Sequence, residues 1–175
     1  GHIVGQNRCF ESAQGEWVLF VANDVRMLPD CIKPMWLLRQ TFGVMQTGLM
    51  TTDASVDNFG LAWRWPGYGI SHKHPTLHPD SFTGTMYLMT KRLWEYLGKF
   101  DEALESSHED VDFSLRLQKI GKRIHCLPTL GAHHLGNATL RHQPSHNRAA
   151  FHRDRVYVIK KHYRGFPRFL RLAAV

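Results

Sequence analysis

Trp-Val-Leu-Phe-Val-Ala-Asn-Asp, residues 17–24, is the stretch of sequence that decides the fold. Its first six residues form an unbroken apolar run of strand length, which is typical of a strand covered on both faces. Such strands occur in the sheets of α/β domains, where ligands bind at the carboxyl ends of the strands. Asn23 and Asp24 stand at that end. The stretch therefore predicts an α/β fold with two polar side chains where a ligand would bind.

Strands and helices are expected to alternate around this stretch. Apolar runs predict further strands, and helical periodicity between Gly and Pro residues predicts the helices. The expected strands are 44–51, 85–89 and 122–127, and the expected helices are 6–14, 30–42, 91–97, 107–120 and 145–163. Pro34 is compatible with its helix only within the first turn. We expect a three-layer α/β/α sandwich with a mostly parallel sheet over residues 1–144, followed by a basic amphipathic helix and tail over residues 145–175.

Three carboxylates, Glu109, Asp110 and Asp112, stand at the start of one predicted helix. Ser107 and Asp110 match the Ser-x-x-Asp spacing of a capping box. The helix dipole favours negative charge at this end, so Glu109 and Asp110 would stay ionised. Two interpretations follow: these two carboxylates only stabilise the helix end, or they act as a base or hold a cation. Asp112 is expected to pair with Arg116, four residues further on.

The formal charge of +7 is concentrated at the carboxyl end of the chain. Residues 141–175 contain nine Lys and Arg and one Asp, whereas the whole chain has 22 Lys and Arg and 15 Asp and Glu. The rest of the chain, residues 1–140, is nearly neutral, which does not favour nucleic acid as a partner. The basic tail suits peripheral contact with an anionic membrane surface, with nucleic acid and a plain solvated helix face as the competing interpretations.

The cysteines, Cys9, Cys31 and Cys126, are widely spaced and form no Cys-x-x-Cys pattern. Neither a disulfide framework nor a zinc knuckle is indicated, which fits a reducing compartment. The sequence has no run of about 18 apolar residues and no visible signal peptide. We therefore expect a cytoplasmic location, or a peripheral one on the cytoplasmic face of a membrane.

Trp63, Trp65 and Tyr68 lie in a Gly- and Pro-rich segment, residues 53–80, that is expected to be irregular. Exposed rings there would suit stacking on sugars or on a partner surface, or the rings fold back as a small satellite core. The same segment contains three histidines, at positions 72, 74 and 78. Their spacing matches no metal-binding motif, so we expect no zinc site there.

Four segments with distinctive motifs follow one another along the chain, at residues 5–25, 84–102, 109–112 and 128–139. Gly-Gln-Asn-Arg at residues 5–8 leads into Gly-Glu-Trp-Val-Leu at 15–19, and the strand then ends in Ala-Asn-Asp-Val at 22–25. Glu-Asp-Val-Asp follows at 109–112, and His-Leu-Gly-Asn-Ala-Thr at 134–139. In order and spacing they resemble the family 2 glycosyltransferases of the GT-A fold, most closely the rhamnosyltransferase-like subgroup. One such motif would be weak, but four in the right order are specific.

Two features depart from the pattern of that family. Ala22 stands where a full DxD metal motif has its first acid, so Asp24 alone represents the motif. The family's opening strand, first helix and second strand, which hold the nucleotide base, have no counterpart before Gly1. The resemblance therefore implies an amino-terminally truncated GT-A fold with half of a donor site.

The resemblance implies a glycosyltransferase of polysaccharide biosynthesis, which moves a sugar from a nucleotide-diphosphate donor to a hydroxyl of a carbohydrate or lipid-linked acceptor. The reaction would be inverting and metal-assisted. Asp110 would be the catalytic base and Glu109 would orient it or the acceptor. Asp24 and His134 would hold Mg²⁺ or Mn²⁺, with His133 as the second choice for the histidine.

The nucleotide sugar would be bound by four polar residues, Asn7, Arg8, Asn23 and Asp24. Residues 1–144 would then be a partial catalytic domain. An alternative from a different class is a non-catalytic fragment that binds carbohydrate or anionic surfaces.

Overall fold

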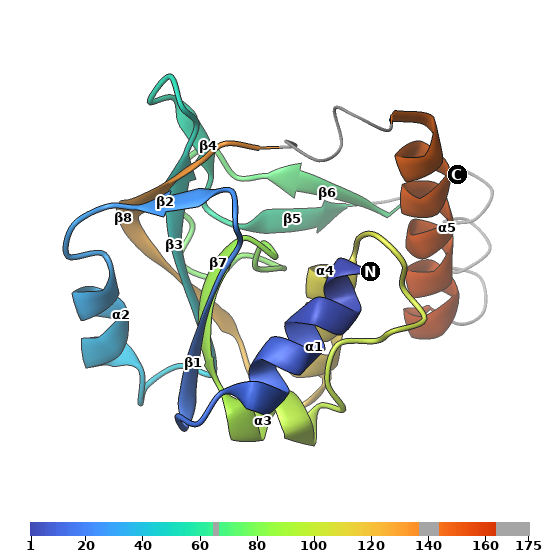
Figure 1. The fold of residues 1–175 in the computed structure, drawn as a ribbon, viewed down its shortest axis with the longest axis horizontal. Coiled ribbons are helices and arrows are strands. Elements are labelled where there is room, and N and C mark those ends of the chain that lie inside the picture. The colour runs from blue at the N-terminus through green and yellow to red at the C-terminus, as the bar shows by residue number, and fades with distance from the viewer. Residues whose placement is uncertain (65–66, 137–143, 164–175) are drawn as a thin grey trace.

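A six-stranded sheet forms the centre of the molecule (Figure 1). The computed structural model describes residues 1–64, 67–136 and 144–163. Five strands follow the order β1-β7-β3-β8-β2, and β4 pairs with β3 beside that path. The strands are β1 (Trp17–Val21), β2 (Val25–Met27), β3 (Val44–Met50), β4 (Val56–Asn58), β7 (Met86–Thr90) and β8 (Ile124–His134). The stretch that decides the fold thus forms strand β1 at one end of the sheet and the turn that follows it.

The strand directions in this sheet are mixed. Among the strand pairs in the described part of the chain, β3 and β8 run parallel, whereas β1–β7, β7–β3, β3–β4 and β2–β8 run antiparallel. The α/β class is confirmed, but the prediction of a mostly parallel sheet is wrong. An apolar run indicates that both faces of a strand are covered, and it does not determine the direction of the neighbouring strands.

β8 continues well beyond the strand predicted over residues 122–127. It passes through Pro128 to His134, and its register against β3 shifts on both sides of Gly48. Because proline has no N–H for the strand ladder, it is tolerated at such an irregularity. His133 and His134 therefore lie in a strand that pairs with β2.

Helices cover both faces of the sheet and give the predicted three layers (Figure 1). Phe10, Trp94 and Phe113 belong to one buried cluster. Met35 belongs to a second cluster, whose other buried members lie on strands. The helices that supply these residues are α1 (His2–Ser12), α2 (Ile32–Leu38), α3 (Lys91–Tyr96) and α4 (Glu109–Lys119). α2 therefore packs on one face of the sheet, and α1, α3 and α4 pack on the other.

α2 is shorter than the helix predicted for this part of the chain. Pro34 is its third residue and falls in the first turn, as expected, where its missing N–H is tolerated. Trp36 and Leu37 stay exposed on this short helix, while Met35 is fully buried. A single buried side chain thus fixes α2 on its face of the sheet.

A hairpin lies within the segment that was expected to be irregular. β5 (Leu61–Arg64) pairs with β6 (Tyr68–Ser71) as a separate two-stranded sheet. Trp63 is buried and joins the cluster on the α1 face, whereas Tyr68 stays 43% exposed. Trp65 lies outside the described residues. Trp63 therefore folds back into the main core and not into a satellite core, and an exposed ring is left at Tyr68.

The start of α4 is not closed by the predicted capping box. The N-cap residue is His108, which adopts a left-handed conformation with φ of 66° and makes no side-chain cap hydrogen bond. The Ser107 hydroxyl lies 2.8 Å from Nδ1 of His108 instead of reaching into the helix. The capping-box prediction is wrong because the left-handed residue turns the preceding chain away from the helix axis.

α5 (Pro144–His162) packs against α4 through the buried carboxylate of Asp112. Asp112 pairs with Arg116 at 2.7 Å, as predicted, and also with Lys161 at 2.8 Å and His162 at 2.7 Å. Burial alone would raise the pKa of Asp112, but the hydrogen bond from His162 and the charges of Arg116 and Lys161 lower it. This ionised carboxylate ties two helices together.

Much of the positive charge on α5 is used within the molecule. Arg153 pairs with an acidic residue of the loop before α4, Lys161 lies 2.6 Å from Asp101, and the Arg155 guanidinium lies 4.3 Å from the centre of the Tyr68 ring. The carboxyl-terminal remainder of the predicted basic tail lies outside the described residues. In the described part of the chain, no helix has the length and apolarity needed to cross a bilayer.

Replacing Asp112 with Asn should lower the stability of the fold. Arg116, Lys161 and His162 would lose their shared carboxylate, and removing one partner of such a buried pair costs about 3 kcal/mol. For a chain of this size, calorimetry should show Tm falling by about 6–12 °C. Glu95→Gln, at an exposed position of α3, is the control and should change stability by less than about 0.5 kcal/mol. An Asp112→Asn variant as stable as the wild type would contradict this role.

Candidate active site

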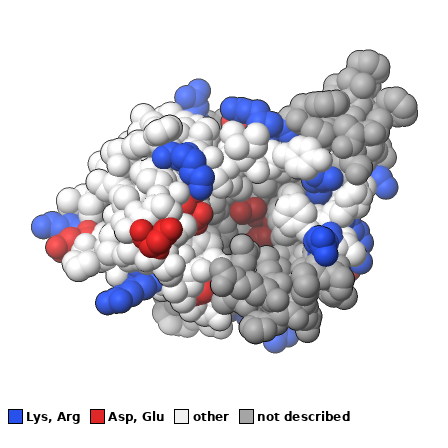
Figure 2. All heavy atoms as spheres, turned by 90° about the horizontal axis from the view of Figure 1, so that it is seen from above, with Lys and Arg blue, Asp and Glu red and all other residues white. Residues whose placement is uncertain are grey.

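A pocket of about 1050 Å³ opens at the carboxyl end of β1. Its walls come from α1, the turn after β1, the start of α4, the β5–β6 hairpin and α5. Figure 2 shows acidic side chains inside and beside a hollow, with Lys and Arg further out. The pocket lining includes Asn23, Asp24, Glu109, Asp110 and His134. Five residues that the sequence predicted for the site thus meet in one cavity.

Asn7 and Arg8 lie away from this pocket. The buried Asn7 amide donates hydrogen bonds to the Phe100 carbonyl at 2.9 Å and to Glu102 at 2.8 Å, and it accepts one from the Phe100 N–H at 3.0 Å. Arg8 is exposed on α1. Asn7 therefore ties α1 to the loop after α3, and neither residue lines this pocket.

Glu109 is held in its ionised form at the back of the pocket. Its carboxylate accepts a hydrogen bond from the Gln6 amide at 2.9 Å and lies 3.2 Å from Nε2 of His2. Gln6 in turn accepts a hydrogen bond from the Tyr87 hydroxyl at 2.9 Å. Burial alone would raise the pKa of Glu109, but the hydrogen bonds from His2 and Gln6 lower it. This network fixes a negative charge beside Asp110.

Asp110 has the opposite electrostatic setting. Burial and the neighbouring charge of Glu109 raise its pKa to about 7, against weaker lowering by backbone hydrogen bonds. Its two oxygens accept hydrogen bonds from the N–H of Gly84 at 3.0 Å and of Val111 at 2.7 Å. A carboxylate with a pKa near 7 can take up a proton from a substrate at physiological pH. Asp110 is therefore suited to be a general base.

Gly84 allows the backbone to approach this carboxylate pair. A Cβ atom at residue 84 would lie 2.6 Å from Oε1 of Glu109 and 3.9 Å from Oδ2 of Asp110. The first distance is shorter than real Cβ contacts, so a side chain here would displace Glu109. The glycine is thus required by the close packing of the strand end against the start of α4.

Asp24 and His134 face each other from neighbouring strand ends. Nε2 of His134 lies 3.4 Å from Oδ2 of Asp24, and its Nδ1 lies 2.8 Å from Oδ2 of Asp57. The hydrogen bond with Asp57 raises the pKa of His134, which burial opposes and the charge of Asp24 reinforces. The Leu135 N–H donates to the Asp24 carbonyl at 2.9 Å, which fixes the two strand ends together. These contacts form a row of three side chains.

The Asp24–His134–Asp57 row fits one edge of a divalent-cation site. Asp57 holds one ring nitrogen of His134, which leaves the other nitrogen directed at Asp24, as in histidines that ligate metals. Carboxylate oxygen and imidazole nitrogen are ligands that Mn²⁺ accepts, and Mg²⁺ accepts the carboxylate. In the described part of the chain, no group of three or more His, Cys, Asp or Glu is arranged to hold a metal ion by itself. Other ligands, such as diphosphate oxygens and water, would have to complete the site.

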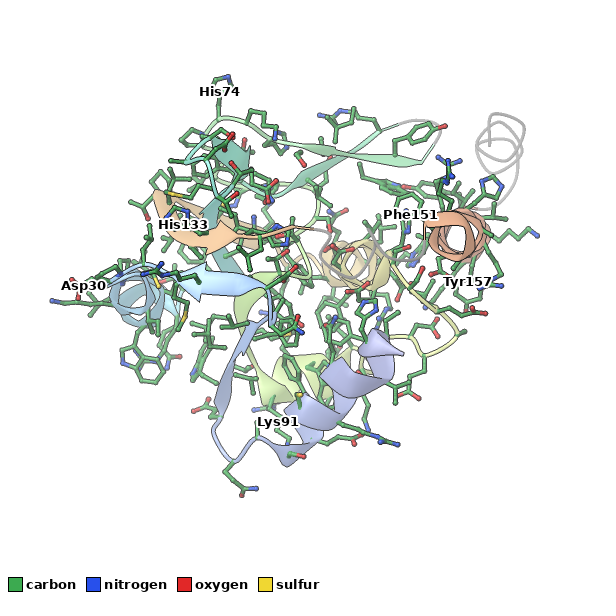
Figure 3. All side chains as sticks on the ribbon, turned by 45° about the horizontal axis from the view of Figure 1, so that its top comes forward. Asp30, His74, Lys91, His133, Phe151 and Tyr157 are labelled. Carbon is green, nitrogen blue, oxygen red and sulfur yellow. The ribbon has the colours of Figure 1, made fainter. Side chains whose placement is uncertain are left out.

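His133 and His78 lie away from the Asp24–His134 pair. His133 extends from β8 beside β2, where its Nδ1 lies 3.1 Å from the Thr51 carbonyl and where it borders a smaller, separate pocket (Figure 3). Nδ1 of His78 lies 3.0 Å from the carbonyl of Ile124. His134 is therefore the histidine that faces Asp24.

Comparison with known proteins identifies the fold. Over 142 residues the chain is 28% identical to the O-antigen biosynthesis protein RfbC of Myxococcus xanthus, a match that covers 69% of this chain and 11% of that protein. No family model matches the chain. TarS of S. aureus superposes with a TM-score of 0.62 at 16% identity, over 92% of this chain and 27% of TarS.

Two further structures hold a nucleotide and Mn²⁺. The mannosyltransferase PcManGT of Pyrobaculum calidifontis, in complex with GDP-Man and Mn²⁺, superposes with a TM-score of 0.61 at 16% identity, over 97% of this chain and 46% of PcManGT. GalNAc-T7 with UDP, GalNAc and Mn²⁺ superposes with a TM-score of 0.61 at 12% identity, over 77% of this chain and 30% of that protein. This chain has the GT-A fold.

The resemblance noted from the motifs is therefore confirmed at the level of the fold. The chain spans 11% of the curated relative and less than half of each of these three solved chains. Within this GT-A fold, Asp24 stands at the end of strand β1 and Asp110 in the first turn of α4, and both side chains line the pocket.

Aromatic side chains form the wall of the pocket opposite the sheet. Trp63 and Phe151 line the pocket together with His108, whose ring lies 5.8 Å from that of Trp63 and 4.5 Å from that of Phe151. Burial lowers the pKa of His108 to about 4, so its ring is neutral at physiological pH. Phe151 extends from the side of α5 that faces the body of the molecule (Figure 3) and is 50% exposed. This wall can accept the apolar face of a ring-shaped ligand.

Sequence reasoning missed three residues that shape the site. Gln6 stands inside a quoted motif, but nothing in the sequence indicates that its amide reaches Glu109 across 103 positions. Asp57 lies in the segment that was expected to be irregular, and no spacing relates it to His134. Phe151 falls on the predicted basic helix, where one aromatic residue among basic ones gives no signal. All three depend on contacts between segments that are distant in the chain.

Asp110→Asn should stabilise the fold, and Glu109→Gln should destabilise it. The raised pKa of Asp110 means that its ionised form costs stability, a cost that begins above the unfolded value near 4 and is complete above about pH 7. The lowered pKa of Glu109 means that its charge contributes stability, which is lost as pH falls through the folded pKa. At pH 8, calorimetry should give a higher Tm for Asp110→Asn and a lower one for Glu109→Gln.

The pH dependence separates this effect from simple repacking. The advantage of Asp110→Asn over the wild type should grow between about pH 4 and pH 7 and then level off. A variant with an unchanged or lower Tm at pH 8 would show that Asp110 is not electrostatically strained.

Proposed function

We propose that this chain contributes the catalytic base and the cation-binding side chains of a glycosyltransferase. The enzyme transfers a sugar from a nucleotide-diphosphate donor to a hydroxyl group of a carbohydrate or lipid-linked acceptor. The observation that carries this proposal is that Asp24 with His134 and Asp110 with Glu109 line the same pocket from different elements. The GT-A fold and the similarity to a protein of O-antigen biosynthesis support this class of reaction.

The pocket suits a single displacement that inverts the configuration at the anomeric carbon of the sugar. Asp110 takes the proton of the acceptor hydroxyl while the acceptor oxygen forms a bond to the anomeric carbon. The bond from that carbon to the diphosphate oxygen breaks, and the nucleoside diphosphate leaves with the bonding electrons. One carboxylate suffices for this step. Glu109 keeps its own charge and raises the pKa of Asp110, which makes Asp110 the stronger base.

Asp24 and His134 are the residues that would hold a divalent cation, Mg²⁺ or Mn²⁺. Such a cation neutralises the charge that develops on a leaving diphosphate. Asp57 keeps His134 in the orientation that directs Nε2 toward Asp24. Asn23 is exposed at the same strand end and lines the pocket, so it is available to a polar group of the donor.

The cellular setting that we infer is polysaccharide biosynthesis at the cytoplasmic face of a membrane. The similarity to an O-antigen biosynthesis protein supports the first part. Peripheral membrane contact would involve the carboxyl-terminal basic residues beyond Tyr163, which lie outside the described residues. The described basic residues of α5 that pair with Asp101, Asp112 and Glu105 are less available for such contact.

Asp110→Asn in the complete protein should abolish transfer without preventing donor binding. Loss of a general base lowers the rate by about 10²–10⁴-fold. Release of nucleoside diphosphate would be measured with UDP-, GDP- and dTDP-sugars, Mn²⁺ and an acceptor extract from the native membrane. Calorimetric affinity for the corresponding nucleoside diphosphate and Mn²⁺ should change by less than about 2-fold, because Asp110 serves the acceptor.

Asp30→Asn is a matched control, because Asp30 is an exposed carboxylate near α2 and far from the pocket (Figure 3). It should leave both transfer and affinity unchanged. Equal loss of transfer and of nucleotide affinity in Asp110→Asn would argue against the assigned role. A wild-type protein that binds carbohydrate but turns over none of these donors would favour the non-catalytic alternative.

Asp57→Asn should weaken Mn²⁺ binding although Asp57 need not touch the ion. The change removes the carboxylate that orients His134, and loss of such a partner typically costs about 10–100-fold in metal affinity. Titration of Mn²⁺ followed by electron paramagnetic resonance, in the presence of nucleoside diphosphate, measures this directly. Asp53→Asn, a nearby exposed residue, is the control and should bind Mn²⁺ like the wild type. Equal Mn²⁺ affinity in Asp57→Asn and in the wild type would contradict the assignment of His134 to the cation site.

A further inference from the structure

α5 carries a buried carboxylate that binds the chain just before the acidic motif. Asp154 is 1% exposed, and its Oδ2 accepts hydrogen bonds from the N–H groups of Ser106 at 2.8 Å and Ser107 at 3.0 Å. The N–H of Glu105 lies 3.2 Å from both carboxylate oxygens, and the Ser106 hydroxyl lies 3.3 Å from Oδ2. Three successive backbone donors thus converge on one side chain from a distant helix. Hydrogen bonds to an ionised acceptor are stronger than neutral ones.

The segment that Asp154 holds is a wall of the pocket. Residues 105–108 line the cavity directly and lead into Glu109 and Asp110. Phe151 lies one turn before Asp154 on α5, contacts the His108 ring and lines the same cavity. Residues three apart on a helix share a face, so α5 presents its aromatic ring and its carboxylate to the same wall. The position of α5 therefore determines the shape of this side of the pocket.

Local sequence does not hold this wall by itself. His108 has a left-handed conformation that is uncommon for a residue with a side chain, and α4 has no side-chain cap at its start. A strained residue persists only where its surroundings fix it. At His108, the rings of Trp63 and Phe151 pack against the imidazole, and Asp154 binds the three preceding N–H groups. Asp154 thus holds the chain before α4 from another helix, although it does not cap the first turn of α4 itself.

We infer that Asp154 is a positioning residue for the acceptor side of the pocket. It fixes residues 105–108 relative to Asp110, and the acceptor then meets the base with its hydroxyl correctly placed. The inference rests on the proposed function, because the acceptor is the ligand of this wall. Misplacement of the acceptor by about 1 Å lowers the rate without any change in the reacting groups.

Tyr157→Phe separates this role from a general role in docking α5. The Tyr157 hydroxyl donates to Asp101 at 2.9 Å, a tie from the same helix to a loop that does not line the pocket. Both Asp154→Asn and Tyr157→Phe weaken the attachment of α5. Only Asp154→Asn removes the acceptor of the three N–H groups, while it keeps the volume of the side chain.

Hydrogen exchange measures the positioning without relying on catalysis. In Asp154→Asn, the amides of residues 105–107 should exchange at least about 10-fold faster than in the wild type, because they lose a charged acceptor. In Tyr157→Phe they should exchange at the wild-type rate. Asp154→Glu keeps the charge but displaces it by one methylene group, and its exchange should be intermediate. This third variant decides the question if Asp154→Asn does not fold. Unchanged exchange in the Asp154 variants would overturn the inference.

Kinetics in the complete protein tests the functional half. Asp154→Asn should lower kcat/KM for the acceptor by about 10-fold or more, while KM for the nucleotide sugar changes by less than about 2-fold. Tyr157→Phe should keep wild-type values for both substrates. If the amides of residues 105–107 exchange faster in Asp154→Asn but the acceptor kinetics are unchanged, Asp154 has only a structural role and the inference is overturned. Absence of transfer in the wild-type protein would instead refute the proposed function. The exchange experiment would still show whether Asp154 fixes residues 105–107, so the two failures can be distinguished.

Discussion

The electrostatic coupling of Glu109 and Asp110 is the constraint on which this site depends. Two adjacent carboxylates, both largely removed from water, cannot both be ionised at low cost. Hydrogen bonds from Gln6 and His2 keep Glu109 ionised. Burial and the charge of Glu109 together raise the pKa of Asp110 to about 7. The position of α1 against the start of α4 and the glycine at residue 84 both serve this arrangement. Packing between distant parts of the chain thus produces a carboxylate that can exchange a proton near neutral pH.

The sheet supplies the other half of the site. β2 pairs with β8, so the turn after β1 and the end of β8 are brought together, and Asp24 comes to face His134. Asp57 completes the row from β4, which pairs with β3 next to β8. The side chains proposed to bind the cation therefore depend on strand pairing, whereas the position of the proposed base, Asp110, depends on helix packing. α5 forms a further side through Phe151 and through residues 105–107, which Asp154 binds, so the pocket lies between the sheet and the helices on one of its faces.

Sequence patterns predicted the parts of this arrangement that are encoded locally. The apolar run before Asp24 and the acidic start of α4 each follow from short-range periodicity, and their order along the chain indicated the GT-A fold. Strand direction could not be read in the same way, because burial of a strand does not depend on the direction of its neighbours. The capping box was also wrong, since the left-handed His108 is stabilised by contacts from other elements. The partners of Gln6 and Asp57 lie more than 70 positions away in the chain, so no local sequence pattern predicts these two contacts.

The central claim is that the cation-binding row and the base share one pocket. Paramagnetic broadening by Mn²⁺ tests it most directly. With this chain labelled with ¹⁵N, Mn²⁺ and a nucleoside diphosphate should broaden the amide signals of Asn23, Gly84 and Asp110, while those of α3 stay sharp. Broadening confined to His72 and His74, or to exposed carboxylates such as Asp30, would contradict the account, because the ion would then bind away from the base.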